Sequence, residues 1–238
     1  MWGPGIAAIC TRLITQRNLR GEGWVPRTGR LLGLAYVLPL LYAFPVYLLA
    51  WASGFGRFDF SKVATQWGGS PVAALPVLMT GGMLLSLSSA LGEEIGWRGL
   101  LVPELAKLTS FRGTVLVSAA FWATWHMPLV IGGNYRGEGT TLAYSIVCFS
   151  TMVLGISAIA AWIRLKSGSL WPAAVLHASH NLFVQGLFDT STINRGAAWL
   201  TGEFGIGLAV TVSIAAWLIC RATIVTEGST IGRLQTQA

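Results

Sequence analysis

The sequence predicts an all-α membrane protein, a polytopic bundle of about six transmembrane helices with one further membrane-embedded or interfacial helix. Of its 238 residues, 53% are hydrophobic and only 11% are charged, whereas soluble domains carry about 25% charged residues. Residues 31–53 and 69–92 contain no Asp, Glu, Lys, Arg or His. Because a membrane core about 30 Å thick is crossed by roughly 20 helical residues, each run is long enough to span it.

Six apolar runs are predicted to be spans, and short connections containing Gly, Pro and charged residues separate them. In chain order they are residues 31–53, 71–91, 113–131, 141–163, 170–188 and 203–220. We expect one transmembrane domain at 31–220, preceded by a cytoplasmic or interfacial segment at 1–30 and followed by a cytoplasmic tail at 221–238.

The connection between the second and third runs, residues 93–107, is predicted to be helical. Glu94 and Arg98 stand four residues apart in it, so that on a helix they share a face and can pair. This segment either continues the second span or forms a separate helix embedded in the membrane.

The basic residues predict the orientation of the spans. With the N-terminus inside, twelve of the sixteen Lys and Arg residues fall in inner connections, as the positive-inside rule expects. The four in outer connections are Arg57, Lys62, Arg136 and Arg195. Both termini are therefore expected in the cytoplasm. Thirteen Arg against three Lys indicate a GC-rich, bacterial genome, so that the expected location is a bacterial cytoplasmic membrane.

Charge and cysteine content exclude other classes. The net charge of +7 does not indicate a nucleic-acid partner, because the basic residues form no stripe and are not interleaved with aromatics. Cys10, Cys148 and Cys220 are too widely spaced for a disulfide framework or a zinc motif. Residues 5–10 are apolar but lack a basic stretch before them, so we expect an interfacial helix or part of a longer span rather than a cleaved signal peptide.

All three histidines of the chain, His126, His177 and His180, fall inside predicted spans. Ionisable groups in a membrane are costly and usually face a bundle interior or a wet cavity. A single such histidine is often a packing or interhelical hydrogen-bonding residue. Three of them, together with the Glu93–Glu94 pair at the border of a span, favour a functional site.

Helical spacing sorts these polar residues. His177 and Asn181 are four residues apart and leave the same helix face, with His180 near that face in a supporting position. Glu93 and Glu94 point about 100° apart, so only one of them easily faces a shared cavity. If Arg98 pairs with Glu94, Glu93 is left free for chemistry.

A glutamate, two histidines and an asparagine suit the hydrolysis of a peptide bond. This reaction needs a base that deprotonates water and donors that stabilise the oxyanion. A buried glutamate can serve as the base, a histidine can orient the water, and a second histidine and an amide on one helix face can supply the donors.

Three motifs carry a family resemblance. Residues 92–99, Gly-Glu-Glu-Ile-Gly-Trp-Arg-Gly, resemble the Glu-Glu-x-x-x-Arg motif of the CPBP family, which comprises the type II CAAX prenyl proteases (Rce1-like) and the Abi proteins. Residues 122–126 resemble its Phe-x-x-x-His motif, with Trp122 in place of Phe, and residues 177–181 resemble His-x-x-x-Asn/Asp. The motifs stand in the family's order, and the resemblance runs from about the first to the fifth predicted span, which is most of the chain.

The resemblance implies an intramembrane endopeptidase of the glutamate type that acts on a membrane-associated protein or peptide. It implies that Glu93 and His126 activate the water and that His177 and Asn181 hold the oxyanion. The residues expected to support them are Glu94, Arg98, His180 and Trp122.

The resemblance leaves the cofactor open, because the family is often labelled metalloprotease. Glu93, His126 and His177 have the composition of a zinc set of two histidines and one carboxylate. The chain has no His-Glu-x-x-His motif, however, and metal-free hydrolysis is the preferred expectation.

Three alternatives remain open. Ser157 in a Gly-x-Ser-x sequence, with His177 as its base, would make a serine protease, although Gly and Ser in a span more often serve close packing. A proton-coupled transporter would also use intramembrane Glu and His, but it would not require Asn181. A catalytically silent immunity or binding protein would share the scaffold.

The predicted spans contain one conflict. They place Glu93 at the inner edge of the membrane and His126 thirteen residues into the third span, roughly 20 Å deeper at about 1.5 Å per residue. If both bind one water, the helix that carries Glu93 must dip into the membrane, the third span must start deeper, or a water-filled cavity must connect them.

Overall fold

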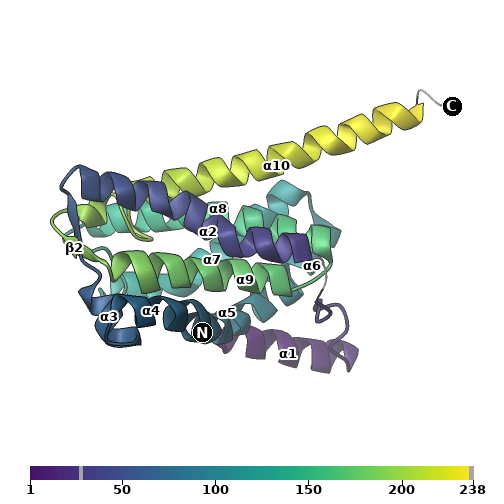
Figure 1. Ribbon diagram of the computed structural model, residues 1–238. Helices are drawn as coiled ribbons and strands as arrows, with labels where there is room; N and C mark the ends of the chain where they lie inside the picture. The colour runs from purple at the N-terminus through teal and green to yellow at the C-terminus, as the bar shows by residue number, and fades with distance from the viewer. Residues whose placement is uncertain (27–28, 236–238) are drawn as a thin grey trace.

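The computed structural model describes residues 1–26 and 29–235, and it places side chains as far as residue 221 in the last helix. The α-helices are α1 (Gly3–Gln16), α2 (Gly29–Ala52), α3 (Ser61–Trp67), α4 (Pro71–Val77), α5 (Met83–Glu94), α6 (Val102–Leu108), α7 (Phe111–Ile131), α8 (Leu142–Ser167), α9 (Trp171–His180) and α10 (Ile206–Gln235). Three π-helical segments, η1 (Leu78–Gly82), η2 (Ile95–Leu101) and η3 (Asn181–Asp189), and the short 3-10 helix η4 (Ala197–Trp199) complete the helices. The predicted all-α class is confirmed (Figure 1).

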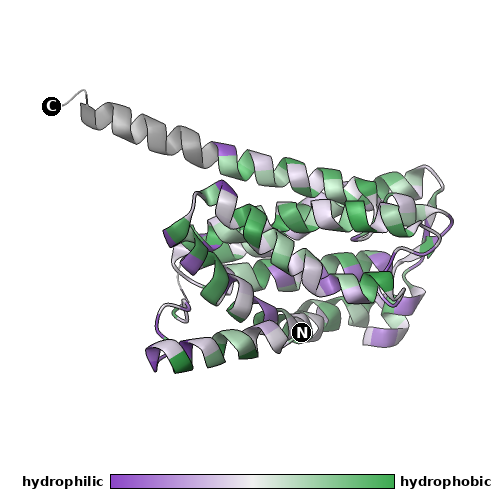
Figure 2. Cartoon of the chain, turned by 180° about the vertical axis from the view of Figure 1, so that it is seen from behind, coloured by the Kyte–Doolittle hydropathy of each residue, from purple (hydrophilic) through white to green (hydrophobic). Residues whose placement is uncertain are grey.

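In the part of the chain that the structure describes, four helical stretches are long and apolar enough to cross a membrane, namely α2, Pro71–Leu108, α7 and α8. The protein is therefore an integral membrane protein. Hydrophobic residues occur along its helices (Figure 2), and many of the large ones are exposed. These stretches correspond to the first four predicted spans. The fifth corresponds to α9 followed by η3, and within the described side chains the sixth is a shorter apolar helix, Ile206–Arg221.

The segment that carries the Glu-Glu motif continues the second span. Elements α4, η1, α5, η2 and α6 form one helical stretch of 38 residues, Pro71–Leu108. The helix therefore does not end at residue 91, where the predicted second span ended, and Glu93 lies inside this longer stretch. The predicted conflict with His126 disappears, since Glu93 Oε1 lies 4.0 Å from His126 Nε2. After Leu108 a short turn leads into α7. The Ser110 side chain caps this helix by accepting a hydrogen bond from the backbone amide of Gly113.

Helices α8 and α9 form the centre of the bundle. Helix α8 packs against α7 and α10, and α9 packs against α2, α5 and α8. Gly155 lets α8 approach α10 closely, because a Cβ at this position would lie 2.7 Å from Val212 Cγ1. The core between these helices therefore depends on small residues as well as on aliphatic side chains.

The N-terminal helix α1 packs on the bundle alongside α5 and η2 (Figure 1). A Cβ on Gly96 would lie 2.6 Å from Pro4 Cβ, and a Cβ on Gly5 would collide with the carbonyl of Gly92. Only glycine permits this close approach. Helix α1 thus joins the predicted segment 1–30 to the bundle. It contacts Gly92 and Gly96, which lie on either side of the Glu-Glu pair in the sequence.

Further differences from the prediction concern the connections and the last helix. A short antiparallel pair of strands, β1 (Gly56–Phe58) and β2 (Thr192–Asn194), joins the connection after α2 to the loop before α10. The predicted sixth span begins too early, because α10 starts at Ile206 and Glu203 lies in the loop before it. Helix α10 continues to Gln235, past the predicted start of the tail at 221, and residues 236–238 lie outside the described residues.

Candidate active site

The structure brings the predicted catalytic residues together from four elements. Glu93 is the penultimate residue of α5, His126 lies on α7, His177 lies on α9, and Asn181 begins η3. One π-helical segment, η3, thus begins at Asn181, and another, η2, begins two residues after Glu93. A π turn widens the helix and changes the direction of the following side chains, and such turns occur frequently at functional sites.

The Glu93 carboxylate is held by one of its two oxygens. Trp122 Nε1 donates a hydrogen bond to Oε2 at 2.7 Å, and Trp97 Nε1 donates to the same oxygen at 3.3 Å. Oε1 has no hydrogen-bond partner among the described residues. Glu93 is fully buried and does not itself line the neighbouring cavity. Its free oxygen faces His126, which does line that cavity.

The backbone of α7 fixes the tautomer of His126. His126 Nδ1 lies 3.1 Å from the carbonyl oxygen of Trp122. A carbonyl only accepts, so Nδ1 carries the hydrogen and Nε2 of the neutral ring carries a lone pair. Nε2 and Glu93 Oε1 are then two acceptors 4.0 Å apart, too far for a direct hydrogen bond. A molecule that donates two hydrogens, such as water, can satisfy both.

The predicted ion pair between Glu94 and Arg98 is present and fully buried. Arg98 Nη1 donates to Glu94 Oε1 at 2.8 Å, and His177 Nδ1 lies 3.0 Å from the same oxygen. The Arg98 guanidinium stacks 4.3 Å from the centre of the Trp122 ring. Arg98 therefore connects the carboxylate beside His177 to the indole that holds Glu93.

Ser157, the nucleophile of the serine-protease alternative, takes part in this arrangement. Its hydroxyl accepts from Arg98 Nη2 at 3.3 Å, and it is buried on α8. The hydrogen bond described for Ser157 is thus to Arg98 rather than to His177. This geometry supports a packing and anchoring position for Ser157.

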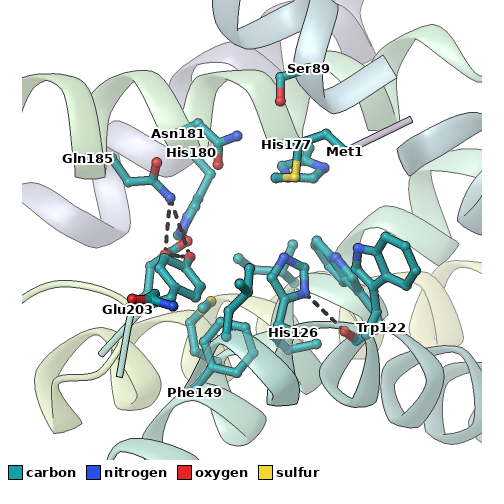
Figure 3. Close-up of a pocket in the computed structure, with 17 residues that line it drawn as sticks. Met1, Ser89, Trp122, His126, Phe149, His177, His180, Asn181, Gln185 and Glu203 are labelled. Carbon is teal, nitrogen blue, oxygen red and sulfur yellow. Dashed lines mark hydrogen bonds and ion pairs between the residues drawn. The ribbon is translucent and has the colours of Figure 1, made fainter. Parts of the chain in front are cut away.

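A cavity of about 290 Å³ lies between these helices. His177 and Asn181 lie on one side of it, and His126 lies across from them (Figure 3). Its apolar wall comes from α8 through Phe149, Met152, Val153 and Ile156. No hydrogen bond is described for the half-buried Asn181 amide, which leaves it available to a bound molecule.

His180, predicted to support the catalytic residues, belongs to a second polar cluster at the other end of the cavity. Tyr42 Oη lies 2.7 Å from His180 Nδ1, and Glu203 Oε1 lies 3.0 Å from His180 Nε2. Gln185 and Tyr135 also donate to Glu203. Glu203 was not among the predicted site residues, although an acidic residue at the border of the last apolar run could have indicated it.

The predicted zinc set does not form a metal site as placed. Among the side chains described in residues 1–26 and 29–221, no three of His, Cys, Asp or Glu lie close enough together to hold a metal ion. The residue types of Glu93, His126 and His177 suit zinc, but their spacing here does not.

Comparison with known proteins adds an independent finding. Residues 74–183 match the family model described as type II CAAX prenyl endopeptidase Rce1-like. This range contains all four predicted catalytic residues. The "CAAX prenyl protease 2" of Methanococcus maripaludis is 30% identical over 125 residues, which cover 50% of this chain and 46% of that protein. The match thus spans a little under half of the relative's length.

Proposed function

This chain belongs, through residues 74–183, to the Rce1-like family of type II CAAX prenyl endopeptidases, and from that premise we propose that it is an intramembrane endopeptidase. Its substrate is a peptide bond in a membrane-associated protein or peptide. The observation that carries the proposal is the pair of acceptors, Glu93 Oε1 and His126 Nε2, 4.0 Å apart beside a cavity.

In the proposed first step, one water donates its two hydrogens to Glu93 Oε1 and His126 Nε2. Its lone pair then attacks the carbonyl carbon of the substrate, and the water's proton passes to Glu93. The two indoles already occupy Oε2, so the proton is directed to Oε1. The C–N bond then breaks as Glu93 returns the proton to the leaving amine.

The oxyanion formed in this step needs donors on the opposite side of the cavity. Asn181 supplies one through its amide group. His177 already uses Nδ1 toward Glu94, so its Nε2 can donate only when the ring is an imidazolium. His177 and Asn181 then hold the oxyanion together.

The test of the proposal starts with substrate trapping. A Glu93→Gln variant expressed in the native host should retain a membrane-associated peptide, and the parent protein in proteoliposomes should cleave that peptide. Dialysis against a strong chelator should leave this cleavage intact. Loss of cleavage that only Zn²⁺ restores would contradict the metal-free mechanism, and absence of any cleavage of the trapped peptide would contradict the protease assignment.

Asn181→Ala should reduce kcat by about 10² to 10³, because the loss of one oxyanion donor typically has this effect. Asn181→Asp should be less impaired, since the resemblance motif accepts Asp at this position. The measurement is single-turnover cleavage of the trapped peptide. Asn18→Ala removes an amide from an exposed position outside the cavity and serves as the matched control. An Asn181→Ala protein with the parental rate would remove Asn181 from the oxyanion site.

We also propose six spans, with both termini in the cytoplasm of a bacterial membrane, because twelve of sixteen basic residues then lie inside. A reporter active only in the cytoplasm should give signal when it is fused after Ala238. A second fusion within residues 136–139, the connection between α7 and α8, should give none. Activity of a periplasmic reporter after Ala238 would overturn the six-span arrangement.

A further inference from the structure

Glu203 occupies the end of the catalytic cavity opposite Trp122, in the loop before α10. Three side chains converge on its carboxylate: His180 Nε2 at 3.0 Å, Gln185 Nε2 at 3.0 Å, and the hydroxyl of Tyr135 (Figure 3). Tyr42 donates to the other ring nitrogen of His180. These contacts fix the orientation of the carboxylate, and Glu203 is only 7% exposed.

No ion pair between this carboxylate and a Lys or Arg is described, although Lys62 and Arg136 line a neighbouring cavity that Glu203 also borders. Among the described side chains that line the cavity there is no Lys, Arg or Asp, and Glu203 is the one carboxylate. Burial of Glu203 and the charge of Glu93 raise the pKa of Glu203 to about 8. Both effects disfavour the ionised form of Glu203. The positive charge of a cation bound beside Glu203 would favour the ionised form and so offset them.

The carboxylate also has room for another partner. An ionised carboxylate offers about four lone-pair positions, and three donors occupy three of them here. A charged N–H donor that enters from the cavity can take the remaining position. Bonds between ionised donors and carboxylates are stronger than neutral ones.

Glu203 lies within reach of a peptide held at the catalytic residues. The Tyr135 ring lies 5.9 Å from the His126 ring, centre to centre, and the Tyr135 hydroxyl contacts Glu203. The wall between the two ends is apolar, with Phe149 packed against both His126 and Tyr135. An extended peptide advances about 3.3–3.6 Å per residue, so a long side chain near the scissile bond can reach Glu203.

We propose that Glu203, positioned by Tyr135, Gln185 and His180, forms a subsite that binds a basic side chain of the substrate, a lysine or an arginine close to the scissile bond. The proposal rests on the proposed endopeptidase function and deepens it by naming the substrate class. The long aliphatic stem of such a side chain crosses the apolar wall while its charged end reaches the carboxylate.

The test uses a peptide library in which one lysine is moved through the positions on both sides of the cleavage site, and each peptide is paired with its acetyl-lysine form. In proteoliposomes the parent protein should cleave one lysine peptide roughly ten to one hundred times more efficiently than its acetylated partner, in kcat/KM. Glu203→Gln should erase this difference mainly through KM, while Glu203→Asp should retain part of it. Glu138→Gln, which removes an exposed carboxylate outside the cavity, should keep the full preference.

The outcomes separate the two proposals. If the parent cleaves no peptide of the library and no trapped substrate, the endopeptidase function is wrong. If it cleaves both forms of every pair equally, the subsite is wrong while the endopeptidase stands, and Glu203 then only ties the loops together. Because this comparison is made on the parent protein, it decides the question even if Glu203→Gln does not fold. A preference that persists in folded Glu203→Gln would also overturn the subsite.

Discussion

Glu93→Gln should lower peptide cleavage to near background while the protein stays folded. Glutamine has nearly the same shape, and its oxygen can still accept from Trp122 and Trp97. Its amide nitrogen, a donor, then replaces the acceptor Oε1 that faces His126 Nε2, so a water between the two loses the group that would take its proton. The loss of a general base costs typically 10²- to 10⁴-fold in rate, and the misdirected amide adds to this loss.

The comparison needs a folded variant and a matched control. Thermal unfolding in detergent and size-exclusion elution should be the same for Glu93→Gln and the parent. Glu138→Gln makes the same chemical change at an exposed position outside the cavity and should cleave normally. His126→Ala should be impaired like Glu93→Gln. Full cleavage by a folded Glu93→Gln protein would show that another group is the base.

Arg98→Ala should lower both the folded yield in detergent and the remaining activity. It leaves the fully buried Glu94 without its cation, and breaking a buried ion pair typically destabilises a protein by about 3–5 kcal/mol. It also removes the guanidinium that stacks on Trp122 and the hydrogen bond to Ser157. The measurements are the yield of monodisperse protein and the midpoint of thermal unfolding.

Two further variants separate stability from catalysis. Arg57→Ala breaks an exposed pair with Asp59, in which the Arg57 side chain is 59% exposed, and it should change stability little. The double variant Glu94→Gln and Arg98→Met replaces both charges and should recover much of the folded yield. A stable but inactive Arg98→Ala protein would assign Arg98 a direct role in catalysis or substrate binding.

Local spacing allowed part of the site to be predicted. Glu94 and Arg98 are four residues apart, and a helix places such a pair on one face whatever surrounds it. The same rule predicted that His177 and Asn181 share a wall of the cavity. In the structure both line the cavity, and the catalytic roles assigned to them remain predictions.

The position of Glu93 relative to His126 could not be predicted from the spacing of residues in the sequence. The apolar pattern stops at residue 92, but the helix continues because η2 and α6 are enclosed by neighbouring helices. The cluster around Glu203 could not be predicted either, because its members come from α2, α9, η3 and two loops that only the fold brings together. The strands β1 and β2 have three residues each, too few for a recognisable alternation.

The glycine contact between α1 and the stretch that carries Glu93 also constrains the order of biogenesis. Gly5 leaves the ribosome long before Gly92 and Gly96, and chains generally begin to fold from the N-terminus during synthesis. Helix α1 must therefore wait at the membrane without its partner while α2 and the first half of the next span are inserted. The contact of α1 behind the Glu-Glu pair is thus completed only after that span is in place.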